Sequence, residues 1–166
     1  MRRPRYSWLI LTILTFLILQ VSILPLIELR GIRPDLLLIA IVFFSLQLGP
    51  THGLGLGIVT GFLKDCLGNG IFGGYAFCFG LLGLIVGYNG KVLYRESPYT
   101  QVVVTFLTSC LAFFLYHSLA KLYQVMPPMK DSLRWVILPA SMYTAVVSLP
   151  VFFLLQKFMG SDPTHR

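Results

Sequence analysis

The sequence predicts an all-α, polytopic membrane protein, a bundle of about six transmembrane helices of which two are short and glycine-rich. Residues 8–27 carry no charge, and comparable uncharged runs recur as far as Gln156. A helix rises ~1.5 Å per residue, so about 20 apolar residues cross a hydrocarbon core of ~30 Å. The composition agrees: 56% of the residues are hydrophobic, only 11% are charged, and the mean hydropathy is +0.79. We therefore expect one membrane domain over residues 1–166.

The first span is expected at residues 8–28. A basic start followed by an apolar run is also typical of a signal peptide, but this run is longer than usual and no small-x-small cleavage pattern follows it. We therefore interpret it as a retained span. The arginines at positions 2, 3 and 5 favour a cytoplasmic amino terminus, because positive charge accumulates on that side of a membrane.

A long uncharged stretch, residues 36–63, decides how many spans the chain makes. As one helix it would be roughly 42 Å long and strongly tilted. Gly49-Pro50 lies near its middle and favours a turn. We therefore predict two short antiparallel helices here and six spans in all. The five spans that follow the first are 36–48, 53–67, 71–88, 100–121 and 135–156. Counting Lys and Arg on the two sides gives about seven to six for either five or six spans, so charge alone leaves the number open.

The chain is basic, with 13 Lys and Arg against 6 Asp and Glu and a formal net charge of +7. These cations lie between the apolar runs, where they can meet anionic lipid headgroups and set topology. No basic stripe interleaved with aromatic residues predicts binding to nucleic acid. The three cysteines, Cys66, Cys78 and Cys110, are odd in number and lie in apolar segments, which argues against a disulfide framework or a metal site.

Glycines at every fourth position mark one helix face: Gly49, Gly53, Gly57 and Gly61, with Asp65 at the next step. In lipid, such faces let two helix backbones approach closely. A second set with spacings of three and four follows at Gly73, Ala76, Gly80, Gly83, Gly87 and Gly90. We expect these two helices to pack together. Gly55, Gly57 and Gly61 also imitate a dinucleotide-binding loop, but no strand-turn-helix context surrounds them.

Charged residues lie near the outer ends of the two short helices. Lys64 and Asp65 are adjacent and are predicted either to pair at the membrane interface or to direct Asp65 into the bundle as an ion, proton or partner site. Earlier in the chain, Pro34 disfavours helix at Arg33, and Asp35 then lies at the start of the next helix, where its carboxylate suits the positive end of the helix dipole.

The sequence predicts no enzyme. His117 is the one histidine well within a span, and we interpret it as a hydrogen-bonded structural group. Ser118 and Lys121 match the serine-x-x-lysine pattern of penicillin-recognising enzymes, but the partner motifs and the folded pocket that this chemistry needs are not evident. No catalytic residue, cofactor or metal ligand is expected, and no cluster of convergent polar groups is evident.

In its order of features the chain resembles the rod shape-determining protein MreD family. The resemblance rests on the basic start, the segment Arg33-Pro34-Asp35-Leu36-Leu37-Leu38-Ile39, the Gly49-Pro50 break, the glycine helix that ends in Asp65, Gly68, and the Phe72-Gly73 turn. Tyr75 departs from the family, since many members have Asn or His there. Nearly the whole chain is covered, most specifically from Gly31 to Gly90.

The resemblance implies a non-enzymatic scaffold or regulatory subunit of the bacterial inner membrane, needed for lateral peptidoglycan synthesis in cell elongation. Its partners would be an MreC-like protein, a RodA-like glycosyltransferase, a class B penicillin-binding protein and, directly or indirectly, MreB filaments. The family is also thought similar in fold to the substrate-binding membrane subunits of energy-coupling-factor transporters, so a vitamin-type transport subunit is the alternative. Residues expected to pack helices or contact partners are Pro34, Asp35, Gly49, Gly53, Gly57, Gly61, Asp65, Gly80, Gly83 and Gly87.

Overall fold

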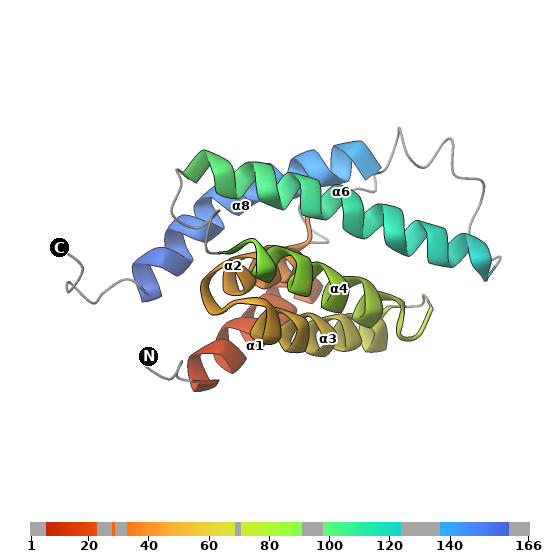
Figure 1. Ribbon diagram of the computed structural model, residues 1–166, viewed down its shortest axis with the longest axis horizontal. Helices are drawn as coiled ribbons and strands as arrows, with labels where there is room; N and C mark the ends of the chain where they lie inside the picture. Colours follow the sequence, from red (N-terminus) through yellow and green to blue (C-terminus); the bar gives the residue numbers. More distant parts are fainter. Residues whose placement is uncertain are drawn as a thin grey trace.

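The computed structural model describes residues 6–22, 28, 33–68, 71–90, 98–123 and 137–159. These residues form an all-helical bundle, as predicted, and Figure 1 shows its arrangement. The six described helices are α1 (Tyr6–Ser22), α2 (Leu36–Leu48), α3 (Pro50–Leu67), α4 (Gly74–Tyr88), α6 (Pro98–Leu122) and α8 (Leu138–Met159).

The uncharged stretch after Asp35 is broken into two helices at Gly49, as the Gly49-Pro50 pair predicts. Gly49 has a φ of 88°, which ends α2 at Leu48 because residues other than glycine rarely adopt it. α3 begins at Pro50, three residues earlier than expected, since proline suits the first helical position, where its missing N–H has no role. α4 begins at Gly74 rather than at residue 71, because Gly73 precedes it with a φ of 86°.

The remaining helices have bounds close to the expected spans. α6 covers all of the expected span 100–121, and α8 covers most of 135–156. The expected start of the last span, residues 135–136, lies outside the described residues. α1 ends at Ser22, and residues 23–27 of the expected first span also lie outside them. By length and composition, Thr100–Leu122 and Leu138–Lys157 are the described helices long and apolar enough to cross a membrane. Helices α2 and α4 are apolar but shorter.

Helix α2 lies at the centre of the bundle. Its segment 36–46 is buried throughout, which explains why its residues are apolar on every side rather than on one stripe. One side packs in a cluster with Val86 of α4 and Phe152 and Leu155 of α8. The other side packs in a second cluster with Cys78, Phe79 and Leu82 of α4 and Ala112 and Tyr116 of α6.

Contacts between helices show that successive described helices run in alternating directions. Asp35 contacts Lys64 near one end of α2 and α3, and Ser45 lies against Gly53 near the other. Antiparallel pairing also joins α3 to α4, where Gly53 faces Gly83 and Gly61 faces Tyr75. Helix α8 runs parallel to α2, because Thr144 bonds Asp35 and Phe152 packs on Phe43.

We call the end of the bundle that contains Asp35 the Asp35 end. There α2, α4 and α8 begin and α1, α3 and α6 finish. Gln20 of α1 accepts a hydrogen bond from the Leu36 N–H at this end, at 3.0 Å. The Tyr6 end of α1 and the Met159 end of α8 consequently lie at the opposite end of the bundle.

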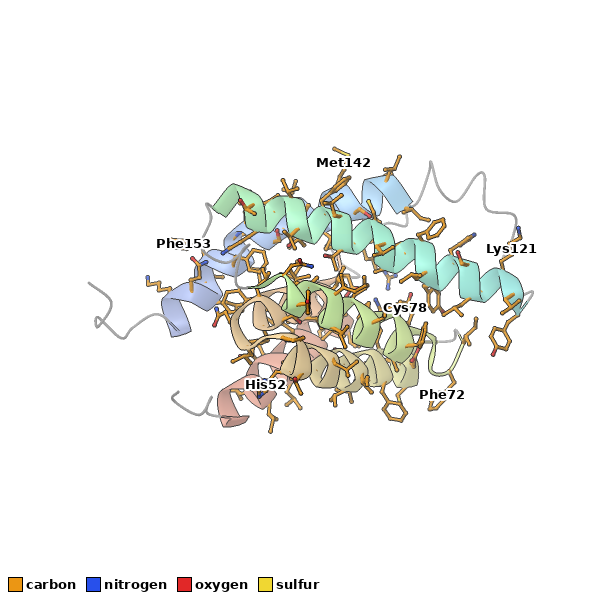
Figure 2. The ribbon with its side chains drawn as sticks, viewed as in Figure 1. His52, Phe72, Cys78, Lys121, Met142 and Phe153 are labelled. Carbon is orange, nitrogen blue, oxygen red and sulfur yellow. The ribbon has the colours of Figure 1, made fainter. Side chains whose placement is uncertain are left out.

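Large apolar side chains cover the outside of the bundle. Phe72, Met142 and Phe153 are between 61% and 70% exposed, and Figure 2 shows them at its periphery, whereas Cys78 lies inside. Soluble monomers rarely expose continuous apolar surface. Here the exposed side chains include Ile10, Leu11, Leu14, Ile18, Val59, Phe62, Val103, Leu107, Val146 and Leu154. Such a surface is suited to contact with acyl chains.

Candidate functional site

The closest helix contact in the bundle joins α3 to α4 through glycines. A Cβ atom added at Gly53, Gly57 or Gly61 would lie less than 3.0 Å from backbone atoms of α4. The facing residues are Gly83, Phe79 and Gly80, and Tyr75 and Ala76. Backbone atoms cannot move aside as a flexible side chain can, so any larger residue at these three positions forces the helices apart.

The glycines of α4 differ in what they contact. Gly83 faces the backbone of Gly53, and Gly87 faces the backbone of Gly49 and Pro50. Gly80 instead faces the side chain of Ile58, which can shift. Gly87 and Gly83 therefore restrict substitution more strongly than Gly80.

Two glycines of the sequence pattern have open space where a side chain would begin. Gly49 shares the spacing of the stripe and its backbone lies against Gly87, but a Cβ atom there would meet nothing within 4 Å, and glycine is needed for the turn. Gly55 is exposed and also has open space beside it. The contact surface on α3 therefore consists of Gly53, Gly57 and Gly61, one helical turn apart.

Asp65 lies at the next turn after Gly61 and caps the neighbouring helix. Its side chain is buried, with 7% of the residue exposed. Oδ1 accepts a hydrogen bond from the Tyr75 N–H at 3.1 Å, and Oδ2 accepts one from the Ala76 N–H at 3.0 Å. These N–H groups belong to the first turn of α4, which has no internal partners for them and carries the positive end of the dipole. Asp65 thus joins the last turn of α3 to the first turn of α4.

Lys64 pairs with Asp35, the residue before α2, so the predicted alternative of a pair with its neighbour Asp65 is wrong. The other alternative placed Asp65 inside the bundle, and its burial agrees with that placement. Consecutive residues on a helix point about 100° apart and do not face each other. Asp65 is directed at α4 while Lys64 is directed at α2. The Lys64 ammonium also lies over the Tyr75 ring, 4.1 Å from its centroid, and 4.9 Å from the centroid of Phe79, within the range of cation–π attraction.

Asp35 has three roles at once. As the residue before α2, it accepts a hydrogen bond from the Leu38 N–H at 3.3 Å, as expected for a carboxylate at a helix start. Its own N–H donates to Thr144 Oγ1 of α8 at 3.2 Å. Its other carboxylate oxygen pairs with Lys64. Pro34 precedes it and is buried.

These contacts form a cluster that we call the charged cluster: Asp35, Lys64, Asp65, Tyr75 and Thr144. A further ring extends it, since Tyr75 stacks on Tyr116 of α6 with centroids 3.9 Å apart. The cluster joins α2, α3, α4, α6 and α8 at the Asp35 end. It also corrects the expectation that no polar groups converge. The sequence does not signal it, because Asp35 and Thr144 lie 109 positions apart.

Other predicted positions lie apart from this cluster. Ser118 Oγ donates to the Phe114 carbonyl of its own helix at 2.8 Å, and Lys121 is exposed. His117 is buried, and its Nε2 has no hydrogen-bond partner, in contrast to the satisfied group that we expected. Across the described segments, no three His, Cys, Asp or Glu side chains gather as a metal site would require.

A family model described as rod shape-determining protein MreD matches residues 2–161. The chain belongs to the MreD family. Neither the curated proteins nor the solved structures contain a significant match to it. As an MreD family protein it is a membrane protein with a role in determining rod shape. Its charged cluster and glycine contact are thus features of a shape-determining membrane protein.

Proposed function

We propose that this MreD family protein is a non-enzymatic scaffold or regulatory subunit of the cell-elongation machinery in the bacterial inner membrane. It would support lateral peptidoglycan synthesis by holding an MreC-like protein, a RodA-like glycosyltransferase and a class B penicillin-binding protein together, with MreB filaments bound directly or indirectly. The family membership carries this proposal.

The use of its charged side chains supports a structural role. Lys64 and Asp35 are bonded to each other, and Asp65 is bonded to the start of α4. A catalytic acid, base or nucleophile would need a side chain that is free to meet a substrate. These three residues instead hold helices in place.

We also propose a topology: six spans in a single domain of residues 1–166, with both termini in the cytoplasm. The alternating directions of the described helices support it, because α1 starts and α8 finishes at the same end of the bundle. The arginines before α1 favour the cytoplasm for that end. The charged cluster would then lie at the outer end of the bundle, near the far side of the membrane.

The alternative is a substrate-binding membrane subunit of a vitamin-type transporter. The convergence of Asp35, Lys64 and Tyr75 favours it, since a ligand pocket needs a few polar groups directed to one place. Their mutual pairing favours the scaffold, because a polar ligand would have to break a buried ion pair to reach them.

Rescue of a depletion strain tests the proposal. The full chain, expressed in a rod-shaped bacterium depleted of its own MreD, should restore rods and copurify the MreC-like protein from solubilised membranes. Restored shape without recovery of any of the named partners would contradict a scaffold. Uptake of a labelled vitamin that depends on the chain would support the transporter instead.

A further inference from the structure

The Lys64 ammonium lies among side chains that come from other helices. The carboxylate of Asp35, just before α2, is its ion-pair partner. The rings of Tyr75 and Phe79 on α4 have their centroids 4.1 and 4.9 Å from the ammonium nitrogen. Tyr116 of α6 stacks on Tyr75 from its other neighbour helix, with centroids 3.9 Å apart. Lys64 itself belongs to α3, so the cation and the groups that surround it are on different elements.

The surrounding groups are held by contacts that do not involve Lys64. The Asp35 N–H donates to Thr144 Oγ1 of α8 at 3.2 Å. The Tyr75 and Phe79 rings contact each other edge to face, with centroids 5.6 Å apart. Phe79 is also fully buried in the apolar cluster that joins α4 to α2 and α6. We therefore expect these groups to keep their positions when the lysine side chain is shortened.

Helix α3 is likewise held in place by contacts of other residues. Its glycines lie against the backbone of α4, and Asp65 accepts two N–H groups from the first turn of that helix. The Lys64 side chain takes no part in these contacts. Lys64→Ala removes only Cγ, Cδ, Cε and Nζ, so it leaves the space of these atoms open beside a carboxylate that has lost its cation.

We propose that Asp35, Tyr75 and Phe79 form a binding site for a primary ammonium group. Lys64 is the tethered ligand of this site, and a free alkylammonium ion binds there once the lysine side chain has been removed. The carboxylate compensates the positive charge and accepts an N–H, while the two ring faces attract the cation. These groups therefore select a cation with N–H donors over a neutral molecule of the same shape.

The burial of the ion pair favours entry of a small ion along the path of the lysine. The Lys64 side chain is 18% exposed, compared with 5% for that of Asp35, so the lysine reaches the acid from the more exposed side. In the unmutated protein the tethered ammonium excludes a free ion, because it loses less translational freedom on binding. This inference does not depend on the scaffold proposal, since it concerns only the chemistry of one cluster.

Rescue of Lys64→Ala by n-propylammonium tests the site, because this ion replaces the atoms that the substitution removes. We expect Lys64→Ala to lower the melting temperature of the full-length protein in detergent. With a dissociation constant of about 1 mM, n-propylammonium chloride at about 50 mM should raise it again by about 5–9 °C. The unmutated protein should shift by less than about 1 °C, because Lys64 already occupies the site. Melting is followed by tryptophan fluorescence, with sodium chloride at the same concentration as the baseline.

Two probes and one variant are the matched controls. n-Propanol has the same length without the charge, and tetramethylammonium has the charge without an N–H, so both should stabilise Lys64→Ala much less than n-propylammonium does. Asp35→Asn combined with Lys64→Ala retains a cap for α2 but lacks the carboxylate, so n-propylammonium should not stabilise it. No rescue of Lys64→Ala would overturn the proposal, and so would an equal response to n-propanol or in the double variant.

A second measurement uses the unmutated protein, so it does not depend on how well Lys64→Ala folds. In protein labelled with ¹³C-lysine, the Cε protons of Lys64 should resonate upfield of those of the exposed Lys121, because they lie near the faces of two aromatic rings. The Lys64 signal is identified by its loss in Lys64→Arg, which keeps a cation at this position. Lysine signals that all overlap with that of Lys121 would show that no ring faces the ammonium, and the proposed site would not exist.

Discussion

Asp35 and Lys64 form an ion pair between residues 29 positions apart, and this pair joins the start of α2 to the end of α3. Its surroundings compensate both charges. Asp35 also accepts the Leu38 N–H, and Lys64 lies over the rings of Tyr75 and Phe79. Charges removed from water need such additional contacts, because their mutual attraction alone barely offsets the loss of hydration. The pair is therefore a specific connection between helices rather than a surface contact.

Removal of Lys64 should destabilise the protein strongly. Lys64→Met leaves the Asp35 carboxylate buried beside apolar rings without its partner, which costs about 3–5 kcal/mol. The double variant Asp35→Asn with Lys64→Met should recover much of this loss, because Asn still caps α2 and no charge remains. The measurement is the thermal midpoint in detergent. Equal stability of Lys64→Met and the unmutated protein would show that the pair contributes nothing.

The glycine contact predicts opposite results for two neighbouring glycines. Gly57→Leu should prevent close packing of α3 on α4 and cost about 1–3 kcal/mol or more, because its side chain meets the backbone of Phe79. Gly55→Leu is the matched control, since it makes the same change on the same helix where open space lies beside the glycine. The readouts are the amount of folded protein in the membrane and copurification with the MreC-like partner. If both variants behave alike, the contact does not hold the two helices together.

Asp65→Asn should weaken the connection between α3 and α4 without a change of size. The carboxylate accepts two N–H groups, whereas an amide has one carbonyl oxygen and presents donors where the second oxygen was. One buried N–H then lacks a partner, at a cost of about 1–3 kcal/mol.

We further expect Asp65→Asn to lower recovery of the membrane complex, measured per amount of folded protein. A control is Asp65→Glu, which keeps the charge and both acceptor oxygens. It should recover more of the membrane complex than Asp65→Asn does. Unchanged stability and recovery in Asp65→Asn would mean that the charge has no role in folding or partner binding.

Topology is tested with reporters fused after Gln156 and beside the turn at Gly49, at the exposed residues Thr51 and His52 in the first turn of α3. Six spans predict cytoplasmic reporter activity at both positions, because the turn lies at the same end of the bundle as the last residues of α8. A periplasmic signal after Gln156 together with a cytoplasmic one at the amino terminus would mean an odd number of spans.

We expect substitutions in the serine-x-x-lysine match to leave function nearly unchanged. Ser118→Ala and Lys121→Ala should each rescue rod shape in a depletion strain almost fully, because Ser118 donates to its own helix and Lys121 is exposed. Both variants should also retain the partner complex. Failure of Ser118→Ala to rescue shape while the complex remains intact would point to chemistry and against a scaffold.

The sequence by itself determined those features that depend on neighbouring residues. Uncharged runs of defined length predicted an all-helical protein, and Gly49-Pro50 predicted the break between α2 and α3, since backbone geometry at these residues is local. The position of Asp35 at a helix start followed for the same reason. Spacing by four also identified which residues of α3 share a face, because the helix repeat alone sets it.

Only the tertiary structure decided which partners these residues have. Lys64 binds Asp35 rather than Asp65, and Asp65 caps α4, because neighbouring side chains on a helix point to different helices around it. Gly57 is packed while Gly55 is open, although both are glycines of one helix, since the packing partner covers a single face of α3. Partner choice depends on how whole helices are arranged, and sequence separation carries no direct information about it.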